Sequence, residues 1–296
     1  MIELISEEKI RSHDYLRIRC EFYNLWNKLF LNKNRIDKVA FRNFGILWPL
    51  VKCMLLTRFR YIWFTSKFTR DILSSELILR SNQLWMIRLW EYPWAILNSD
   101  ISPDSKVLDV GSGWSLFPLY LAQKSNHVDS IDTSEKQMKL LSPVLADILK
   151  LNVNYFVDNA LNLSAEENTY DYVFCISVLE HLEEEVVNRE RVNRHRDRLD
   201  RIAIREFLRV VKPGGRVILT LDYASEDISQ RSFDFDYVKD MIEEFRPNLL
   251  KPLDKFDDIR FTKEKENEMR KLWAEFFPYE PGYPPGGALG IILAKR

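Results

Sequence analysis

Two glycines follow an apolar run in the segment KVLDVGSGWSLFPLYLA, which spans residues 106–122. Glycine lets a backbone turn sharply and lets a ligand approach closely, and the unpaired N–H groups of a helix that starts here favour negative charge. A Gly-x-Gly turn at Gly111 and Gly113 is also compatible with plain packing between a strand and a helix. The neighbouring residues are therefore needed to distinguish a ligand-binding loop from a packing turn.

A carboxylate at the end of the next apolar run favours a ligand. The segment HVDSID ends on Asp132, 23 residues after Asp109, and a carboxylate there can accept hydrogen bonds from the 2′- and 3′-hydroxyls of a ribose. The alternative is an acid that only caps the start of a helix. Trp114 and Ser115 occupy the region where a dinucleotide loop carries its third glycine, so the phosphate-binding fingerprint is incomplete.

Short apolar runs alternate with helical patterns from about Ser102 onward, which is typical of a parallel sheet built from β-α-β units. Ser115 can cap the helix after the glycines, and Ser134 with Gln137 can cap the next one, which Pro143 should kink or split. One long, charged helix is expected over residues 183–209. The expected strands lie at 106–110, 128–131, 153–157, 172–177 and 216–221.

These segments resemble, in order, the motifs of the class I S-adenosylmethionine-dependent methyltransferases. The resemblance covers about residues 83–296 and implies an α/β, Rossmann-like, seven-stranded and mostly parallel sheet with helices on both faces. Residues 1–82 are expected to form a separate α-helical region. The matching segments are the glycine loop, VDSID (128–132), FVDNALNL (156–163), YDYVFCISVLEHL (170–182), LRVVKPGGRVILT (208–220) and the closing strand ALGIILAKR (288–296).

The resemblance also implies the cofactor, S-adenosylmethionine, and the residues that hold it. Asn159 stands where the family more often has an aspartate, and its amide can still bond the adenine edge. The expected cofactor-binding residues are Asp109, Gly111, Ser112, Gly113, Ser115, Asp132, Thr133, Asp158, Asn159, Ala160 and Ser177.

Three residues are candidates for moving a proton if the methyl acceptor is a hydroxyl. His181 follows the fourth strand, and strand ends of such sheets face the ligand crevice. Glu91 lies among aromatic residues in RLWEYPWAIL (88–97), which is suited to a sugar ring or flat acceptor, or simply to a core. Asp222 follows the fifth strand. For each residue, packing or orientation of neighbours is the alternative to catalysis.

Composition limits the class of protein. The 296 residues are 46% hydrophobic and carry a formal net charge of −1, as in an ordinary globular protein. The cysteines, Cys20, Cys53 and Cys175, are far apart, so neither a disulfide framework nor a metal site is expected. No signal peptide or membrane-spanning run is recognised, and a cytoplasmic location is expected.

The region from Arg17 to Arg70 is strongly basic. It holds twelve Lys and Arg against two acids, a net charge of +10, together with many aromatic residues. This pattern predicts amphipathic helices that contact an anionic membrane peripherally or cap the active site. Plain packing of the aromatic residues on the catalytic domain is the alternative.

The predicted function is transfer of a methyl group to a small-molecule, sugar or lipid-linked acceptor, with oxygen as the expected atom. A catalytically silent S-adenosylmethionine-binding regulatory module is the alternative. The incomplete phosphate fingerprint disfavours a nicotinamide-dependent oxidoreductase. Nucleic acid is disfavoured as a partner, because SVLEHL (177–182) lacks the Asn-Pro-Pro-Tyr type of motif found in enzymes that methylate base amines.

Overall fold

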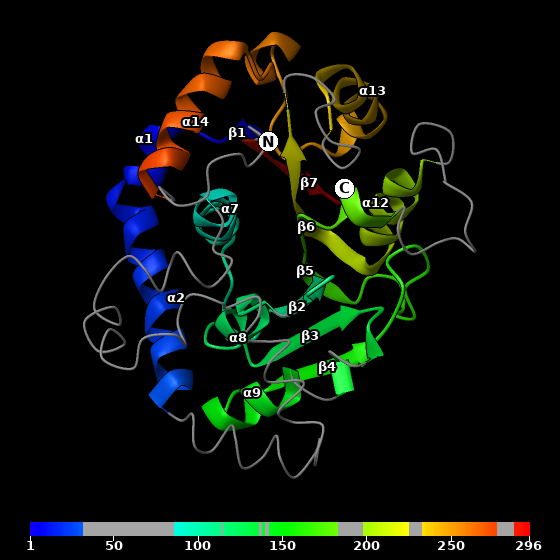
Figure 1. The fold of residues 1–296 in the computed structure, drawn as a ribbon. Coiled ribbons are helices and arrows are strands. Elements are labelled where there is room, and N and C mark those ends of the chain that lie inside the picture. Colours follow the sequence, from blue (N-terminus) through cyan, green and yellow to red (C-terminus); the bar gives the residue numbers. More distant parts are fainter. Residues whose placement is uncertain are drawn as a thin grey trace, which may run out of the picture.

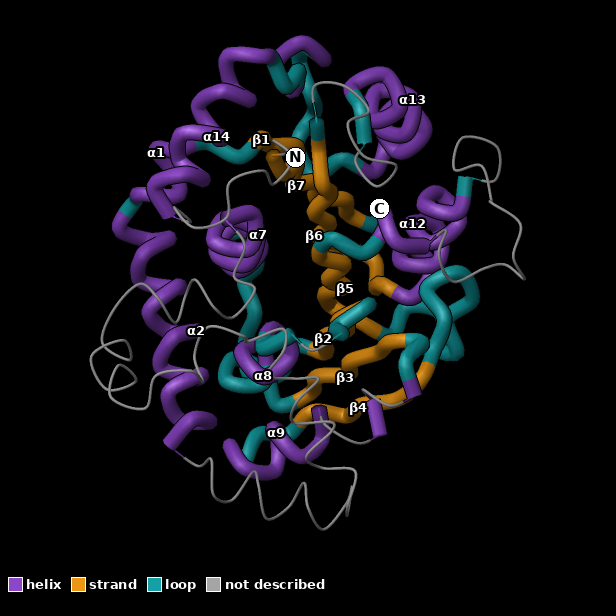
Figure 2. The backbone as a smooth tube through the Cα atoms, viewed as in Figure 1, coloured by secondary structure: helices purple, strands orange, loops and turns teal. Residues whose placement is uncertain are grey.

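The structure is a computed structural model, and it describes residues 1–31, 86–113, 115–135, 138–139, 142–182, 198–224, 233–276 and 287–296. Within them, a seven-stranded sheet runs through the middle of the molecule with helices on both sides (Figure 2). The strands are β1 (Ile2–Leu4), β2 (Lys106–Val110), β3 (His127–Asp132), β4 (Val153–Val157), β5 (Tyr170–Ile176), β6 (Val211–Tyr223) and β7 (Gly287–Ala294).

The strand order is β1-β7-β6-β5-β2-β3-β4. The five strands from β6 to β4 are parallel, whereas β7 runs antiparallel to both β6 and β1. The chain moves from β2 to β3 on one side and later returns to place β5 on the other side of β2. The topology therefore switches direction between β2 and β5, and open α/β sheets bind their ligands outside the carboxyl ends of the strands at such a point.

Helices α2, α7 and α8 lie on one side of the sheet and α12 and α13 on the other (Figure 1). The α-helices are α1 (Glu7–Arg11), α2 (His13–Leu31), α7 (Met86–Leu97), α8 (Phe117–Leu121), α9 (Ser142–Leu149), α12 (Leu199–Val210), α13 (Phe235–Phe245) and α14 (Lys263–Phe276). The described residues also include the short 3-10 helices η3 (Leu179–His181), η4 (Arg246–Asn248) and η5 (Phe256–Ile259).

The expected strands are confirmed, with small shifts at their ends. Those at 106–110 and 153–157 have the expected bounds, and β6 extends the run at 216–221 in both directions. The expectation of one helix over 183–209 is wrong at Arg198, which has a left-handed φ of 48° and so cannot lie within a right-handed helix. Helix α12 begins after it, and residues 183–197 lie outside the described residues. Pro143 stands in the first turn of α9, where proline is tolerated.

The first thirty-one residues pack into the same core as the rest of the described chain. Strand β1, which the sequence pattern did not reveal, extends the sheet beside β7. Ile18, Phe22 and Leu25 of α2 are buried in the common hydrophobic core. The side of α2 that carries these three residues therefore faces the domain. A domain boundary at residue 82 stays a prediction, as do further helices in residues 32–85, which lie outside the described residues.

Helix α7 lies across β7 with an unusually close contact. A Cβ atom on Gly290 would come within 2.4 Å of the Trp94 ring. The Trp94 indole is fully buried, stacks on Trp90 at a centroid distance of 5.3 Å, and donates from Nε1 to Glu3 Oε2 at 2.9 Å. Because Gly290, in the middle of β7, has no side chain, Trp94 of α7 can pack directly against the strand. For the aromatic residues of segment 88–97, packing in the core is the alternative to acceptor binding, and it is correct for Trp90 and Trp94.

Candidate active site

The glycine loop follows the carboxyl end of β2, beside the topological switch. Gly111 and Gly113 have φ values of 71° and 50°, a region that side-chain-bearing residues seldom adopt. The backbone N–H groups of Gly111 and Ser112 both donate to the Ile131 carbonyl, at 2.8 and 3.1 Å. The loop is therefore tied to the end of β3, where Asp132 begins the next turn.

Asp132 links the loop to the start of the following segment. Its Oδ2 accepts a hydrogen bond from Gly113 N at 2.9 Å and its Oδ1 accepts one from Ser134 N at 2.8 Å. A carboxylate has about four lone-pair sites, so two further acceptor positions remain for hydroxyl donors. Asp132 thus does what a capping acid does and also keeps the capacity expected of a ribose-binding carboxylate. Thr133 follows it and is exposed.

Asp109 lies beneath this loop rather than at its surface. Only 3% of the residue is exposed. Burial is the main cause that raises the pKa of its carboxyl to about 8; the nearby charge of Asp132 adds to the rise, and a 3.4 Å hydrogen bond from Ser130 Oγ opposes it. At neutral pH the carboxyl is therefore mostly protonated and can donate a hydrogen bond. Direct contact of Asp109 with a cofactor stays a prediction.

The raised pKa of Asp109 predicts a pH-dependent stability. Between its unfolded pKa near 3.8 and its folded pKa of about 8 the folded state binds more protons, so the free energy of unfolding falls as the pH rises through this window. One group contributes at most about 1.4 kcal/mol per pH unit. Asp109→Asn should remove this contribution, and the variant should gain stability relative to the wild type from pH 5 to pH 8.

Urea unfolding of both proteins at several pH values measures this difference. Asp171→Asn is the matched control, since the pKa of the Asp171 carboxyl is lowered despite the opposing effect of burial, chiefly by its hydrogen bond with Lys212. This variant should instead lose stability relative to the wild type as the pH rises toward about 4, and the difference should stay constant from pH 5 to pH 8, where the carboxyl is ionised in both the folded and the unfolded state. A constant difference between Asp109→Asn and the wild type across the range would contradict the assignment.

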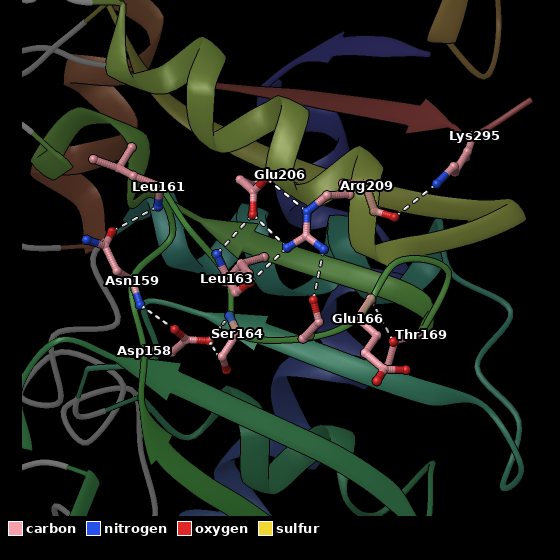
Figure 3. Close-up of polar contacts among 11 residues, drawn as sticks. Asp158, Asn159, Leu161, Leu163, Ser164, Glu166, Thr169, Glu206, Arg209 and Lys295 are labelled. Carbon is pink, nitrogen blue, oxygen red and sulfur yellow. Dashed lines mark hydrogen bonds and ion pairs between the residues drawn. The ribbon is translucent and has the colours of Figure 1, made fainter.

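The segment after β4 is held by side chains that fold back on the backbone (Figure 3). Asp158 Oδ1 accepts from Asn159 N at 2.9 Å, and its Oδ2 accepts from the Ser164 amide and hydroxyl at 3.0 and 2.9 Å. Asn159 Oδ1 accepts from Leu161 N at 2.9 Å, which leaves the exposed amide nitrogen of Asn159 turned away from that contact. Ala160 is buried. Asp158 therefore acts on the shape of the loop.

Helix α12 fixes the far end of the same segment. Arg209 donates to the Leu163 and Ala165 carbonyls at 2.8 and 2.9 Å, and Glu206 Oε2 accepts from Leu163 N at 3.0 Å (Figure 3). Glu206 and Arg209 also form an ion pair at 2.7 Å. These two side chains satisfy backbone groups that have no strand partner, so the loop that borders the expected adenine position is held at both ends.

Ser115 connects the glycine loop to the helices above it. Ser115 is not the N-cap expected from the sequence, because α8 begins after Leu116. The Ser115 Oγ nevertheless accepts from Phe117 N, the first amide of α8, at 2.8 Å and lies 3.0 Å from the Tyr92 hydroxyl of α7. Tyr92 stacks with Phe117 and with Phe22 of α2, at centroid distances of 5.0 and 5.2 Å. An aromatic cluster thus joins the N-terminal helix to the loop, and this connection could not be read from local sequence.

Glu91 and Ser177 meet at the carboxyl ends of β5 and β6. The Glu91 carboxylate is fully buried, and its Oε1 accepts from Ser177 Oγ in a short hydrogen bond and from Thr220 Oγ1 at 2.6 Å. Asp222 Oδ1 lies 3.4 Å from Ser177 Oγ. The structure therefore brings three of the predicted site residues together. Thr220 is a member that sequence reasoning missed, since it reads as one more residue of a buried strand.

His181 ends the 3-10 turn η3, close in sequence to Ser177. The imidazole-bearing residue is half-buried, and its backbone N–H donates to the Val178 carbonyl at 2.8 Å. Its role as a proton acceptor stays a prediction. In the described part of the chain no group of three or more His, Cys, Asp or Glu side chains could hold a metal ion. The same part contains no helix that is long and apolar enough to cross a membrane.

Comparison with known proteins agrees with this geometry. Residues 108–219, from the middle of β2 through most of β6, match the family described as "Methyltransferase domain". Demethylmenaquinone methyltransferase of Bacillus cereus strain ATCC 10987 is 26% identical over 151 residues, which is 50% of this chain and 55% of that protein. The protein of the same description from Bacillus anthracis strain A0248 is 25% identical over the same length. The chain thus spans about half the length of the curated relatives it matches.

Solved structures share the fold at low sequence identity. Geranyl diphosphate methyltransferase in complex with S-adenosylmethionine gives a TM-score of 0.52 at 13% identity, over 75% of this chain and 90% of that one. The [4+2]-cyclase SpnF gives a TM-score of 0.50 at 18% identity, over 72% and 82% of the two chains. The two proteins carry the names of different reactions, so the shared fold by itself does not select the chemistry.

Proposed function

We propose that the chain transfers a methyl group from S-adenosylmethionine to a small-molecule acceptor, since residues 108–219 match the family described as "Methyltransferase domain". The observation that carries the proposal is the link between the glycine loop after β2 and Asp132 at the end of β3. The loop is preshaped by two positive-φ glycines, and the carboxylate accepts from Gly113 N at 2.9 Å. A ribose and the methionine part of the cofactor fit these two neighbours.

The residues of the site divide the work of binding. Asp132 has lone pairs for the ribose hydroxyls, the exposed Asn159 amide suits the adenine edge, and the glycine loop lets the cofactor approach the backbone. When bound, S-adenosylmethionine supplies a methyl group already activated on a sulfonium. The protein then has to align the acceptor with that methyl group and exclude water, because orientation alone lowers the barrier substantially.

The finer proposal concerns the acceptor. We propose a sugar or lipid-linked acceptor that is methylated at oxygen, for which the proton of the hydroxyl has to reach a base. Asp222, half-buried at the end of β6, and His181 in η3 are the candidates for that base. Demethylmenaquinone methyltransferase is similar to this chain over half its length, which supports a small molecule as the acceptor class.

Packing on the domain accounts for part of the basic segment 17–70, so the proposed membrane contact concerns the rest of it. Ile18, Phe22 and Leu25 are buried, so the packing alternative accounts for these three residues of α2. We propose that the remaining basic residues of 17–70 bring the cytoplasmic protein to anionic lipid. Cosedimentation with vesicles tests this proposal: binding should rise with the anionic lipid fraction and fall with salt. If neutral and anionic vesicles cosediment equal amounts of the protein, the proposed contact with anionic lipid is wrong.

Calorimetry with S-adenosylmethionine, S-adenosylhomocysteine and NADH tests the cofactor. The first two should bind at one site and NADH should not. Incubation of the loaded protein with a cell extract and methyl-labelled cofactor then separates an enzyme from a silent binding module, since only an enzyme passes label to an extract component. Binding of the cofactor without any transfer would favour the regulatory alternative.

A further inference from the structure

Glu91 is a charged residue in an unusual place. It lies on α7 with none of its surface exposed, although a carboxylate is stable in a protein interior only when donors compensate for the lost water. Two hydroxyl donors, Ser177 Oγ and Thr220 Oγ1, approach the same oxygen, Oε1. They come from the ends of two neighbouring strands, so one side chain of α7 joins β5 to β6.

Ser177 is held in a conformation that serine rarely adopts. Its φ is 48°, in the left-handed region, at the point where the chain leaves β5 and turns into η3. This conformation is strained for a residue with a side chain, which keeps it only where the surroundings over-determine it. Here the Ser177 amide donates to the Thr220 carbonyl and hydroxyl, both at 3.1 Å, while its own hydroxyl donates to Glu91.

The next residue in the chain shapes the glycine loop. A Cβ atom placed on Gly111 would lie 2.5 and 2.6 Å from the two methyl carbons of Val178. Val178 therefore occupies the space beside the first loop glycine, and its position follows from the turn at Ser177. A continuous set of contacts runs from the buried carboxylate through Ser177 and Val178 to Gly111.

From these contacts we infer that Glu91 is a positioning residue for the cofactor loop and not the proton acceptor. It fixes the left-handed turn at Ser177, and that turn holds Val178 against Gly111. The inference rests on the proposed function, because it concerns how the loop is shaped to receive S-adenosylmethionine. It assigns proton transfer to the other residues at this edge of the sheet, Asp222 and His181.

Calorimetry with S-adenosylhomocysteine as the probe tests the inference. Glu91→Gln keeps the volume of the side chain but weakens the acceptor for the two hydroxyls, and the affinity should fall about fivefold as the turn at Ser177 relaxes. The double variant Glu91→Gln/Ser177→Gly should recover most of the lost affinity, because glycine adopts a positive φ without a supporting hydrogen bond. A proton acceptor would show no change in probe affinity in the first variant and no rescue in the second.

Two further variants keep the test decisive. Trp94→Phe removes a hydrogen bond of the same helix, to Glu3, without touching Ser177; it should lower the melting temperature and leave the affinity unchanged. Ser177→Ala breaks the Glu91 contact from the other side, and it should lower the affinity even if Glu91→Gln does not fold. Wild-type affinity in Ser177→Ala would overturn the inference alone, whereas a wild-type protein that does not bind the probe would overturn the proposed function with it.

Discussion

Gly111→Ala is expected to weaken the binding of S-adenosylhomocysteine at least about 100-fold, which corresponds to about 3 kcal/mol. Two costs combine at this residue. An L-residue at a φ of 71° is strained, and the new Cβ would lie 2.5 Å from a Val178 methyl group that packs beside the loop. Because neither cost can be relieved without moving the loop or the turn at Ser177, the alanine variant should lose the shape that admits the cofactor.

Gly214→Ala is the matched control for Gly111→Ala. Gly214 has a φ of 79°, but no atom lies within 4 Å of the position that a Cβ would take there. Its substitution should therefore lower stability by about 1–2 kcal/mol through backbone strain alone and leave probe affinity unchanged. Isothermal titration calorimetry and thermal unfolding of both variants separate the two effects. Equal affinity of Gly111→Ala and wild type would contradict the placement of the cofactor on this loop.

Asp132→Ala is expected to weaken the binding of S-adenosylmethionine at least about tenfold, since hydrogen bonds to a charged group contribute about 1.5–3 kcal/mol each. The substitution removes the ribose acceptor and also the contact at 2.9 Å that holds Gly113 N. The affinity of Asp132→Asn should lie between those of the wild type and Asp132→Ala, because the amide keeps one acceptor oxygen for either the ribose or Gly113 N. Calorimetry at fixed pH gives the dissociation constants.

Asp171→Ala is the control for the loss of such a carboxylate elsewhere. Asp171 accepts from Lys106 N at 2.7 Å and pairs with Lys212 at 2.8 Å, near the amino end of β2 and away from the glycine loop. Its removal should change stability and not cofactor affinity. If Asp132→Ala binds as tightly as the wild type while Asp171→Ala is folded and normal, the ribose assignment is wrong.

Short-range sequence patterns predicted the strands and the loop of the α/β domain. The runs at 106–110 and 153–157 become strands with those bounds, and the glycines after the first run adopt positive φ. Strand periodicity and glycine freedom are properties of a few neighbouring residues, so they are visible in the sequence. Arg198 is the counterexample: arginine has no marked preference for the left-handed region, so the sequence did not indicate that α12 begins only after this residue.

Short-range patterns are enough to predict the parallel sheet, the loop at Gly111 and Gly113, and the acid at the end of β3. The contacts of Glu91, in contrast, depend on the tertiary fold. Its partners Ser177 and Thr220 are 86 and 129 residues away, and a buried carboxylate gains its role from whichever donors the fold delivers to it. The same holds for β1, a three-residue strand that is stable only because β7 supplies its hydrogen-bond partners.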